Sequence, residues 1–173
     1  MKNSIRFFLF AAATILVQAC GNDKEIKEND LPEGMVAVDL TAYGKPFTLP
    51  VPDTANMPLQ ISDEADGALL VRSGEGFVMR VYEQHNDLTI KKDDLNYDEV
   101  NRLKRIIVDD ANGLIWESSI TRPEFHFVRN ITLAGTEYSF EDAAGNVFSR
   151  EEVEAMYNSA GKARAVEWDQ HSQ

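Results

Sequence analysis

One feature most constrains what this chain can be. It is a short apolar segment beside the N-terminus, followed at once by the only cysteine of the chain. Lys2 and Arg6 give the segment a positive start, and residues 7–17 carry no charge. This is the layout of a secretory signal, whereas a membrane-spanning helix needs roughly twenty apolar residues. Because a single cysteine allows no disulfide within the chain, the domain behind the segment must be stabilised by packing alone.

The cysteine lies in the tetrapeptide Val17-Gln18-Ala19-Cys20, with a small residue directly before it. This tetrapeptide resembles the lipobox of bacterial lipoproteins, although Val17 and Gln18 replace the commonest Leu-Ala or Leu-Ser pair. The resemblance implies cleavage before Cys20 and attachment there of a diacylglycerol, usually with a third chain such as palmitate. It also implies a place in the cell envelope, at the outer membrane. Two alternatives stay open: an ordinary secretory signal, which would leave a free thiol, and a retained membrane anchor.

The rest of the chain predicts one domain on a tether. Removal of the first 19 of 173 residues would leave 154, enough for a single domain with a core. We expect a signal peptide at residues 1–19, followed by the lipidated cysteine with a flexible tether at residues 20–34. One folded domain is expected at residues 35–161, and a tail of uncertain order at residues 162–173. The tether is nearly all polar and cannot bury enough surface to order itself. Its acids also resemble the surface-export signals of some Gram-negative lipoproteins, so the periplasmic face and the cell surface both remain possible locations.

The net charge of the chain limits the classes of partner that it can bind. The whole chain has a formal net charge of −12, and its first 19 residues carry two basic residues and no acid. Residues 20–173 therefore carry about two negative charges more, which argues against nucleic acid, since phosphate contacts need clustered Lys and Arg. We expect the membrane, through the lipid anchor, and an envelope protein or glycan as partners.

Alternating apolar residues and turn signals predict a series of strands interrupted by two helices. The first helix is expected to begin with Asn96 as N-cap and to end before Asn112-Gly113, and the second to begin with Ser149 as N-cap. We expect an α+β fold, mostly antiparallel sheet, with the two short helices packed on one face. The predicted strands are residues 35–40, 47–49 (an edge strand in a proline-rich stretch), 59–62, 68–72, 77–82, 114–120, 124–133 and 136–140.

Few residues indicate chemistry. The sequence contains no Gly-x-Ser-x-Gly elbow, no His-Glu-x-x-His and no Walker loop. Its three histidines show no ligand spacing, and the acid clusters at 63–66 and 109–112 lack the ligand pattern of a calcium loop. We therefore expect no catalytic residue, no cofactor and no metal. Asp53-Thr54-Ala55 resembles the acceptor pattern of a bacterial periplasmic O-glycosylation system, which makes Thr54 a candidate modification site; the alternative is a plain exposed loop.

The second group of strands carries the remaining candidates. His126 lies between Phe125 and Phe127, on the opposite face of its strand, and the simplest interpretation is a surface or half-buried histidine. The aromatic residues of this group are expected to be mainly core, with an exposed binding patch as the alternative. We therefore predict a membrane-tethered, non-enzymatic binding or assembly module. The alternative is a small envelope hydrolase whose site is not recognisable from sequence.

The anchoring hypothesis predicts the behaviour of Cys20→Ser. This change removes the thiol that lipid transfer requires, so the variant should accumulate as an uncleaved precursor or as a soluble form. Metabolic labelling with radioactive fatty acid checks this. Label on Cys20→Ser at the level of the native chain would show that the lipobox interpretation is wrong.

Overall fold

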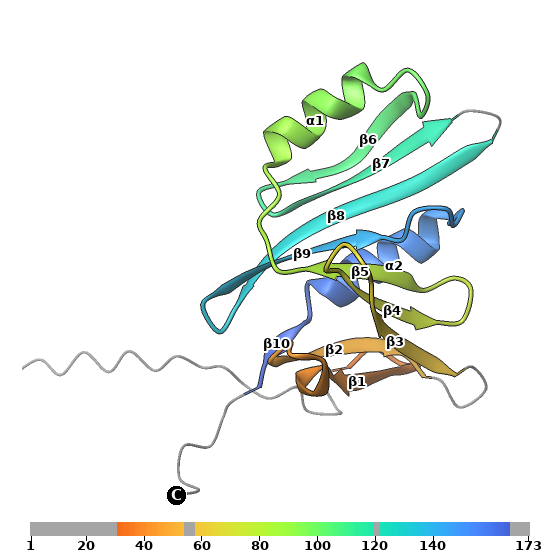
Figure 1. The fold of residues 1–173 in the computed structure, drawn as a ribbon. Helices are drawn as coiled ribbons and strands as arrows, with labels where there is room; N and C mark the ends of the chain where they lie inside the picture. Colours follow the sequence, from red (N-terminus) through yellow and green to blue (C-terminus); the bar gives the residue numbers. More distant parts are fainter. Residues whose placement is uncertain (1–30, 54–57, 120–121, 167–173) are drawn as a thin grey trace, which may run out of the picture.

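The computed structural model describes residues 31–53, 58–119 and 122–166, which form two antiparallel sheets and two α-helices (Figure 1). A seven-stranded sheet has the order β3-β4-β5-β9-β8-β7-β6, and a three-stranded sheet has the order β1-β2-β10. The large sheet contains β3 (Leu59–Asp63), β4 (Leu69–Ser73), β5 (Val78–Tyr82), β6 (Leu103–Asp110), β7 (Gly113–Ser119), β8 (Pro123–Leu133) and β9 (Thr136–Asp142). The small sheet contains β1 (Met35–Asp39), β2 (Phe47–Pro52) and β10 (Arg164–Ala165). The helices are the 3₁₀ turn η2 (Thr41–Tyr43), α1 (Leu88–Tyr97) and α2 (Arg150–Ala160).

The main core lies between one face of the large sheet, α2 and the small sheet. Phe47 of β2 makes edge-to-face contacts with the rings of Tyr138 and Phe140 in β9, at centroid distances of 4.9 and 5.9 Å. From α2, Val153 and Met156 are fully buried in the same cluster. Burial of this apolar surface, with no disulfide to assist it, is the main force holding the two sheets together.

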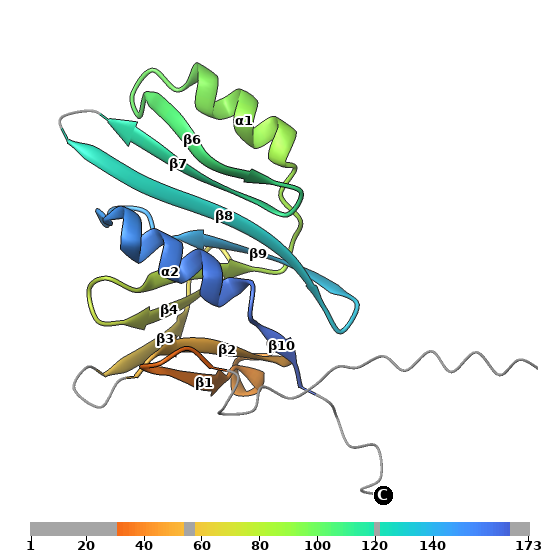
Figure 2. The same cartoon turned by 180° about the vertical axis from the view of Figure 1, so that it is seen from behind.

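The two helices contact opposite faces of the large sheet. Leu95 of α1 packs with Leu114, Trp116 and Val128, whereas their strand neighbours, such as Phe127, belong to the core under α2. Successive side chains of a strand point to opposite faces, so the two contact sets cannot share a face. Figures 1 and 2 show α1 beside β6 and α2 crossing β8 and β9. The predicted α+β class with a mostly antiparallel sheet is confirmed, but packing of both helices on one face is not.

The start of α2 follows the predicted capping box. The Ser149 side chain accepts a hydrogen bond from the Glu152 backbone N–H, and the Glu152 carboxylate accepts one from the Ser149 backbone N–H. Phe148 before the cap and Val153 after it are both buried in the main core. The local sequence thus fixes both where α2 begins and how it docks.

The predicted helix from Asn96 to residue 111 is wrong. Asn96 lies near the end of α1, whose N-cap is Asp87, and residues 103–110 form strand β6. Two bulges interrupt the pairing of β6 with β7, and the first, between Leu103 and Arg105, brings Leu103 and Ile106 onto the same side of the strand. Apolar residues spaced by three imitate a helical pattern, which the bulges explain. The run Ile106-Ile107-Val108 is β-branched and favours the strand.

Two smaller expectations also change. The strand around residues 47–49 is central in its sheet, because β1 and β10 pair with its two sides. Its prolines at 50 and 52 are tolerated because β10 opposes only Phe47 and Thr48. The pairing of β10 also places ordered structure beyond residue 161, where the sequence predicted the domain to end.

The caps predict a contrast in stability. Ser149→Ala and Asp87→Ala each remove a side chain that accepts backbone N–H groups at a helix start, and each should cost about 1 kcal/mol of unfolding free energy. Asn96→Ala changes an exposed residue in the last turns of α1 and should have almost no effect. Urea unfolding of the three variants measures the contrast. A loss at Asn96 as large as that at Asp87 would contradict the assigned start of α1.

Candidate functional site

The two site residues predicted from sequence, Cys20 and Thr54, lie outside the described residues. The structure therefore leaves the lipid attachment and the O-glycosylation as predictions.

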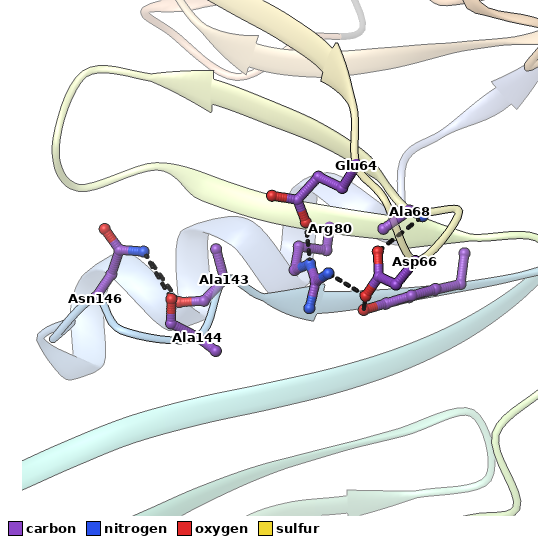
Figure 3. Close-up of polar contacts among 8 residues, drawn as sticks. Glu64, Asp66, Ala68, Arg80, Ala143, Ala144 and Asn146 are labelled. Carbon is purple, nitrogen blue, oxygen red and sulfur yellow. Dashed lines mark hydrogen bonds and ion pairs between the residues drawn. The ribbon is translucent and has the colours of Figure 1, made fainter.

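The acid cluster at residues 63–66 is engaged by an arginine. Arg80 of β5 donates from Nε to Glu64 at 2.6 Å and pairs through Nη2 with Asp66, which also accepts from the Tyr82 hydroxyl at 3.2 Å (Figure 3). The backbone N–H of Ala68 donates to Asp66 as well, and these donors hold the pKa of Asp66 below its ordinary value. Among the described residues, no group of three or more His, Cys, Asp or Glu is placed to hold a metal ion.

The aromatic residues of the second strand group belong to the core. Trp116, Phe127, Tyr138 and Phe140 are buried, and Phe125 packs partly buried against the main cluster. The alternative of an exposed aromatic patch on these strands is therefore wrong.

A groove lies beside β8 in the large sheet. Strand β7 begins at Gly113, opposite Arg129, so the last residues of the longer β8 extend past it without a partner on that side. Two cavities of about 430 and 290 Å³ follow this free edge and share Ile131, Thr132 and Gly161 among their lining residues. We call the two cavities together the β8 groove. Its far wall comes from the end of α2 and from β10.

The edge of β8 offers backbone hydrogen-bonding groups to this groove. The Asn130 N–H donates to the Asn112 carbonyl at 2.7 Å, which is the last contact between β8 and the β6–β7 turn. In an antiparallel ladder, alternate residues direct their N–H and C=O groups to the same side. Thr132 therefore points its backbone groups the same way as Asn130, away from β9 and toward the groove.

Arg129 supplies a half-buried positive charge to the larger cavity. Its guanidinium carbon lies 4.3 Å from the centre of the Tyr157 ring, and Nη1 donates to the Tyr157 carbonyl at 3.1 Å. Nε is buried and lacks an acceptor, and Nη2 forms no hydrogen bond with a described residue. Gly161 makes room for this arrangement, because a Cβ there would lie 2.5 Å from the guanidinium carbon. Tyr157 and Gly161 thus hold the guanidinium in place, Nε is buried, and Nη2 is left without a hydrogen bond to a described residue.

An acid, Asp110, balances the charge of Arg129 without pairing with it directly. The Tyr157 hydroxyl donates to Asp110 at 2.6 Å. Burial alone would raise the pKa of Asp110, but the hydrogen bonds from Tyr157 and from the Asn112 backbone, together with the Arg129 charge, lower it. Burial and the neighbouring Asp110 raise the pKa of Tyr157. Asp110 therefore stays ionised and Tyr157 stays neutral at physiological pH. The negative charge of Asp110 stabilises the neighbouring Arg129 cation.

The rim of the groove carries a second, exposed pair. His85 Nδ1 lies 3.3 Å from Glu137, with both side chains more than half exposed. His85 lines the larger cavity together with Asn112 and Thr132. The larger cavity therefore combines one half-buried cation with neutral polar groups and a single rim carboxylate, and the exposed Arg164 lines the smaller cavity.

His126 takes part in a separate hydrogen-bonded array on the other side of the sheet from α2. Ser118 Oγ lies 3.1 Å from His126 Nε2, and His126 Nδ1 lies 2.9 Å from Asp142. The second Asp142 oxygen accepts from the Phe127 backbone N–H, and the His126 ring stacks on Trp116. Since Asp142 is hydrogen-bonded to Nδ1, we assign the proton to that nitrogen, which leaves Nε2 to accept from Ser118. This has the order of a Ser-His-Asp triad, but Ser118 is 1% exposed.

Comparison with protein-family models, with curated proteins and with solved structures finds no match to this chain. Among the described residues, no helix is long and apolar enough to cross a membrane.

Sequence reasoning missed Arg129, although the sequence contains a signal for it. Phe125, Phe127 and Ile131 alternate on the core-facing side of β8, and Arg129 occupies the position between them where an apolar residue belongs. A charged residue on the buried side of a strand must find a compensating environment. The pattern marks the position, but the partner Tyr157 comes from α2 and could not be located from spacing.

Proposed function

We propose that this protein is a lipid-anchored, non-enzymatic binding module of the cell envelope, and that the β8 groove is its recognition site. The observation that carries the proposal is the half-buried Arg129, whose donors are largely unused beside a cavity of about 430 Å³. Binding pockets typically combine a shaped cavity with a few polar groups that fix the orientation of the ligand. The lipidated Cys20 and its tether would hold the domain at the membrane, with an envelope protein or glycan as the source of the ligand.

The groove predicts a bound species that a blocking variant loses. Thr132 is exposed and lines both cavities, so Thr132→Trp should fill the groove, whereas Asn96→Trp places the same side chain on the exposed surface of α1. We expect small molecules from an envelope extract to give saturation-transfer signals with the native protein and with Asn96→Trp, and not with Thr132→Trp. Equal signals from all three proteins, or none from the native protein, would contradict the proposed site.

A second candidate function is hydrolysis at the array of Ser118, His126 and Asp142. The array has the hydrogen bonds that activate a serine nucleophile, since Asp142 orients His126 and Nε2 accepts from Ser118. Against it, the burial of Ser118 keeps substrate from the hydroxyl in this conformation. The array therefore supports a structural role better, with each hydrogen bond contributing about 0.5–1.5 kcal/mol.

The two functions differ in their response to a serine-directed reagent. Because Ser118 is buried, we expect no labelling of the native protein by a fluorophosphonate and no turnover of a generic ester. Mass spectrometry of the treated protein and an ester assay measure both. Labelling or turnover that Ser118→Ala abolishes, while the exposed control Ser62→Ala retains it, would favour the hydrolase.

A further inference from the structure

We infer that the ligand of the β8 groove is the C-terminal end of a peptide, with its terminal carboxylate on Arg129 and its adjoining backbone paired with Thr132. This inference rests on the proposed binding function and names the class of ligand.

The donors of Arg129 fit a carboxylate. Nε is buried, but Nη2 forms no hydrogen bond with a described residue and is the donor that an entering carboxylate could reach. A carboxylate oxygen on this guanidinium would form a charge-assisted hydrogen bond, which is stronger than one between neutral groups. Tyr157 and Gly161 hold the guanidinium in place, so little side-chain freedom would be lost on binding.

The surrounding charges favour a singly charged group over a phosphate. Glu137 lies on the rim, Asp110 lies behind Tyr157, and the chain as a whole carries a net charge of −12. Each of these acids repels a dianion more strongly than a monoanion. Arg129 is the one cationic side chain among the residues that line the larger cavity, apart from His85 when it is protonated.

The free edge of β8 gives the ligand a backbone to match. Thr132 presents both an N–H and a C=O to the groove, and an extended peptide satisfies such a pair by adding to the sheet edge. Simple carboxylates without an amide, such as acetate, satisfy only the Arg129 end. The recognition of both ends therefore selects a peptide.

The direction of the added strand puts its C-terminus at Arg129. Strand β7 runs antiparallel to β8, and its first residue Gly113 lies opposite Arg129. A peptide that occupies the vacant place beside residues 131–133 in the same direction as β7 ends at the β6–β7 turn. Its carboxylate then reaches Arg129, and Asn112 blocks any further residue. Thr132 lies three positions along β8 from Arg129, roughly 10 Å, so two or three residues of extended peptide span the distance.

The smaller cavity restricts the side chains of the peptide. It is lined by Leu133, Ala163 and Ala165, together with the exposed Arg164 and residues of the β8–β9 turn. This small cavity would receive the side chain of the second or third residue from the C-terminus. Small residues such as alanine suit its size best.

The test compares N-acetyl-Ala-Ala-Ala with its C-terminal amide on the purified full-length protein, by calorimetric titration. We expect the acid to bind about tenfold or more tightly than the amide, because the amide keeps the shape and removes the charge. The comparison needs no variant, so folding cannot obscure it. Equal affinities of the native protein for the acid and the amide would overturn the inference and leave the proposed binding function standing. Tighter binding of methyl phosphate than of acetate would overturn the choice of carboxylate.

Variants assign the effect to the groove. Arg129→Gln should bind acid and amide equally, while Arg102→Gln removes the same charge at the far end of β6 and should behave as the native protein. Thr132→Pro deletes the edge N–H and should weaken the tripeptide without affecting acetate, in contrast to Thr132→Val. An unchanged preference for the acid in Arg129→Gln would contradict the inference. Failure of the tripeptide together with silence in the envelope-extract screen would reject the proposed function as well.

Discussion

The difference in length between β8 and its neighbour β7 is the constraint on which the β8 groove depends. β8 has 11 residues and β7 has 7, and the two-residue turn at Ala134-Gly135 continues β8 directly into β9. Both turn residues have positive φ, as the tight hairpin turn requires. The hairpin can therefore extend past the β6–β7 turn and remain paired on its β9 side. The end of β8 therefore has a short edge without a neighbouring strand, and α2 and β10 form the wall of the groove beside it.

Helix α2 connects this edge to the core. Tyr157 packs its ring against Phe127 and under Arg129, and its hydroxyl reaches Asp110 in β6. Gly113 allows the approach, because a Cβ there would lie 2.7 Å from the Tyr157 ring and 2.6 Å from the Val128 carbonyl. The capping box at Ser149 sets where α2 begins, and therefore which of its residues meets β8. The position of Arg129 is thus determined by a helix start some twenty residues further along the chain.

The sequence predicted the hairpins and α2 because each depends on residues close together in the chain. Turn residues mark β4–β5 and β8–β9, and the capping box marks α2. It failed between residues 87 and 110. In α1 the apolar residues that pack against the sheet are Leu88 and Leu95, while Ile90 is 60% exposed, so no amphipathic pattern reveals the helix. In β6 the bulges replaced the two-residue period of a strand. Pairing partners create both effects, and the partners lie elsewhere in the chain.

The same distinction applies to the candidate site. The alternation along β8 marks Arg129 as anomalous, but a structural role could account for a buried arginine. Its stacking on Tyr157 and its hydrogen bond to the Tyr157 carbonyl are such a role, and they use one face and one of the five N–H donors. A structure that needed only a cation at this position would gain nothing from a planar group with several donors, because a lysine supplies the charge with fewer groups to satisfy. A stabilising role does not explain why donors of Arg129 are unused, or why they lie beside an open strand edge. A terminal carboxylate would accept from the unused donors, and the peptide backbone that follows it would pair with the strand edge.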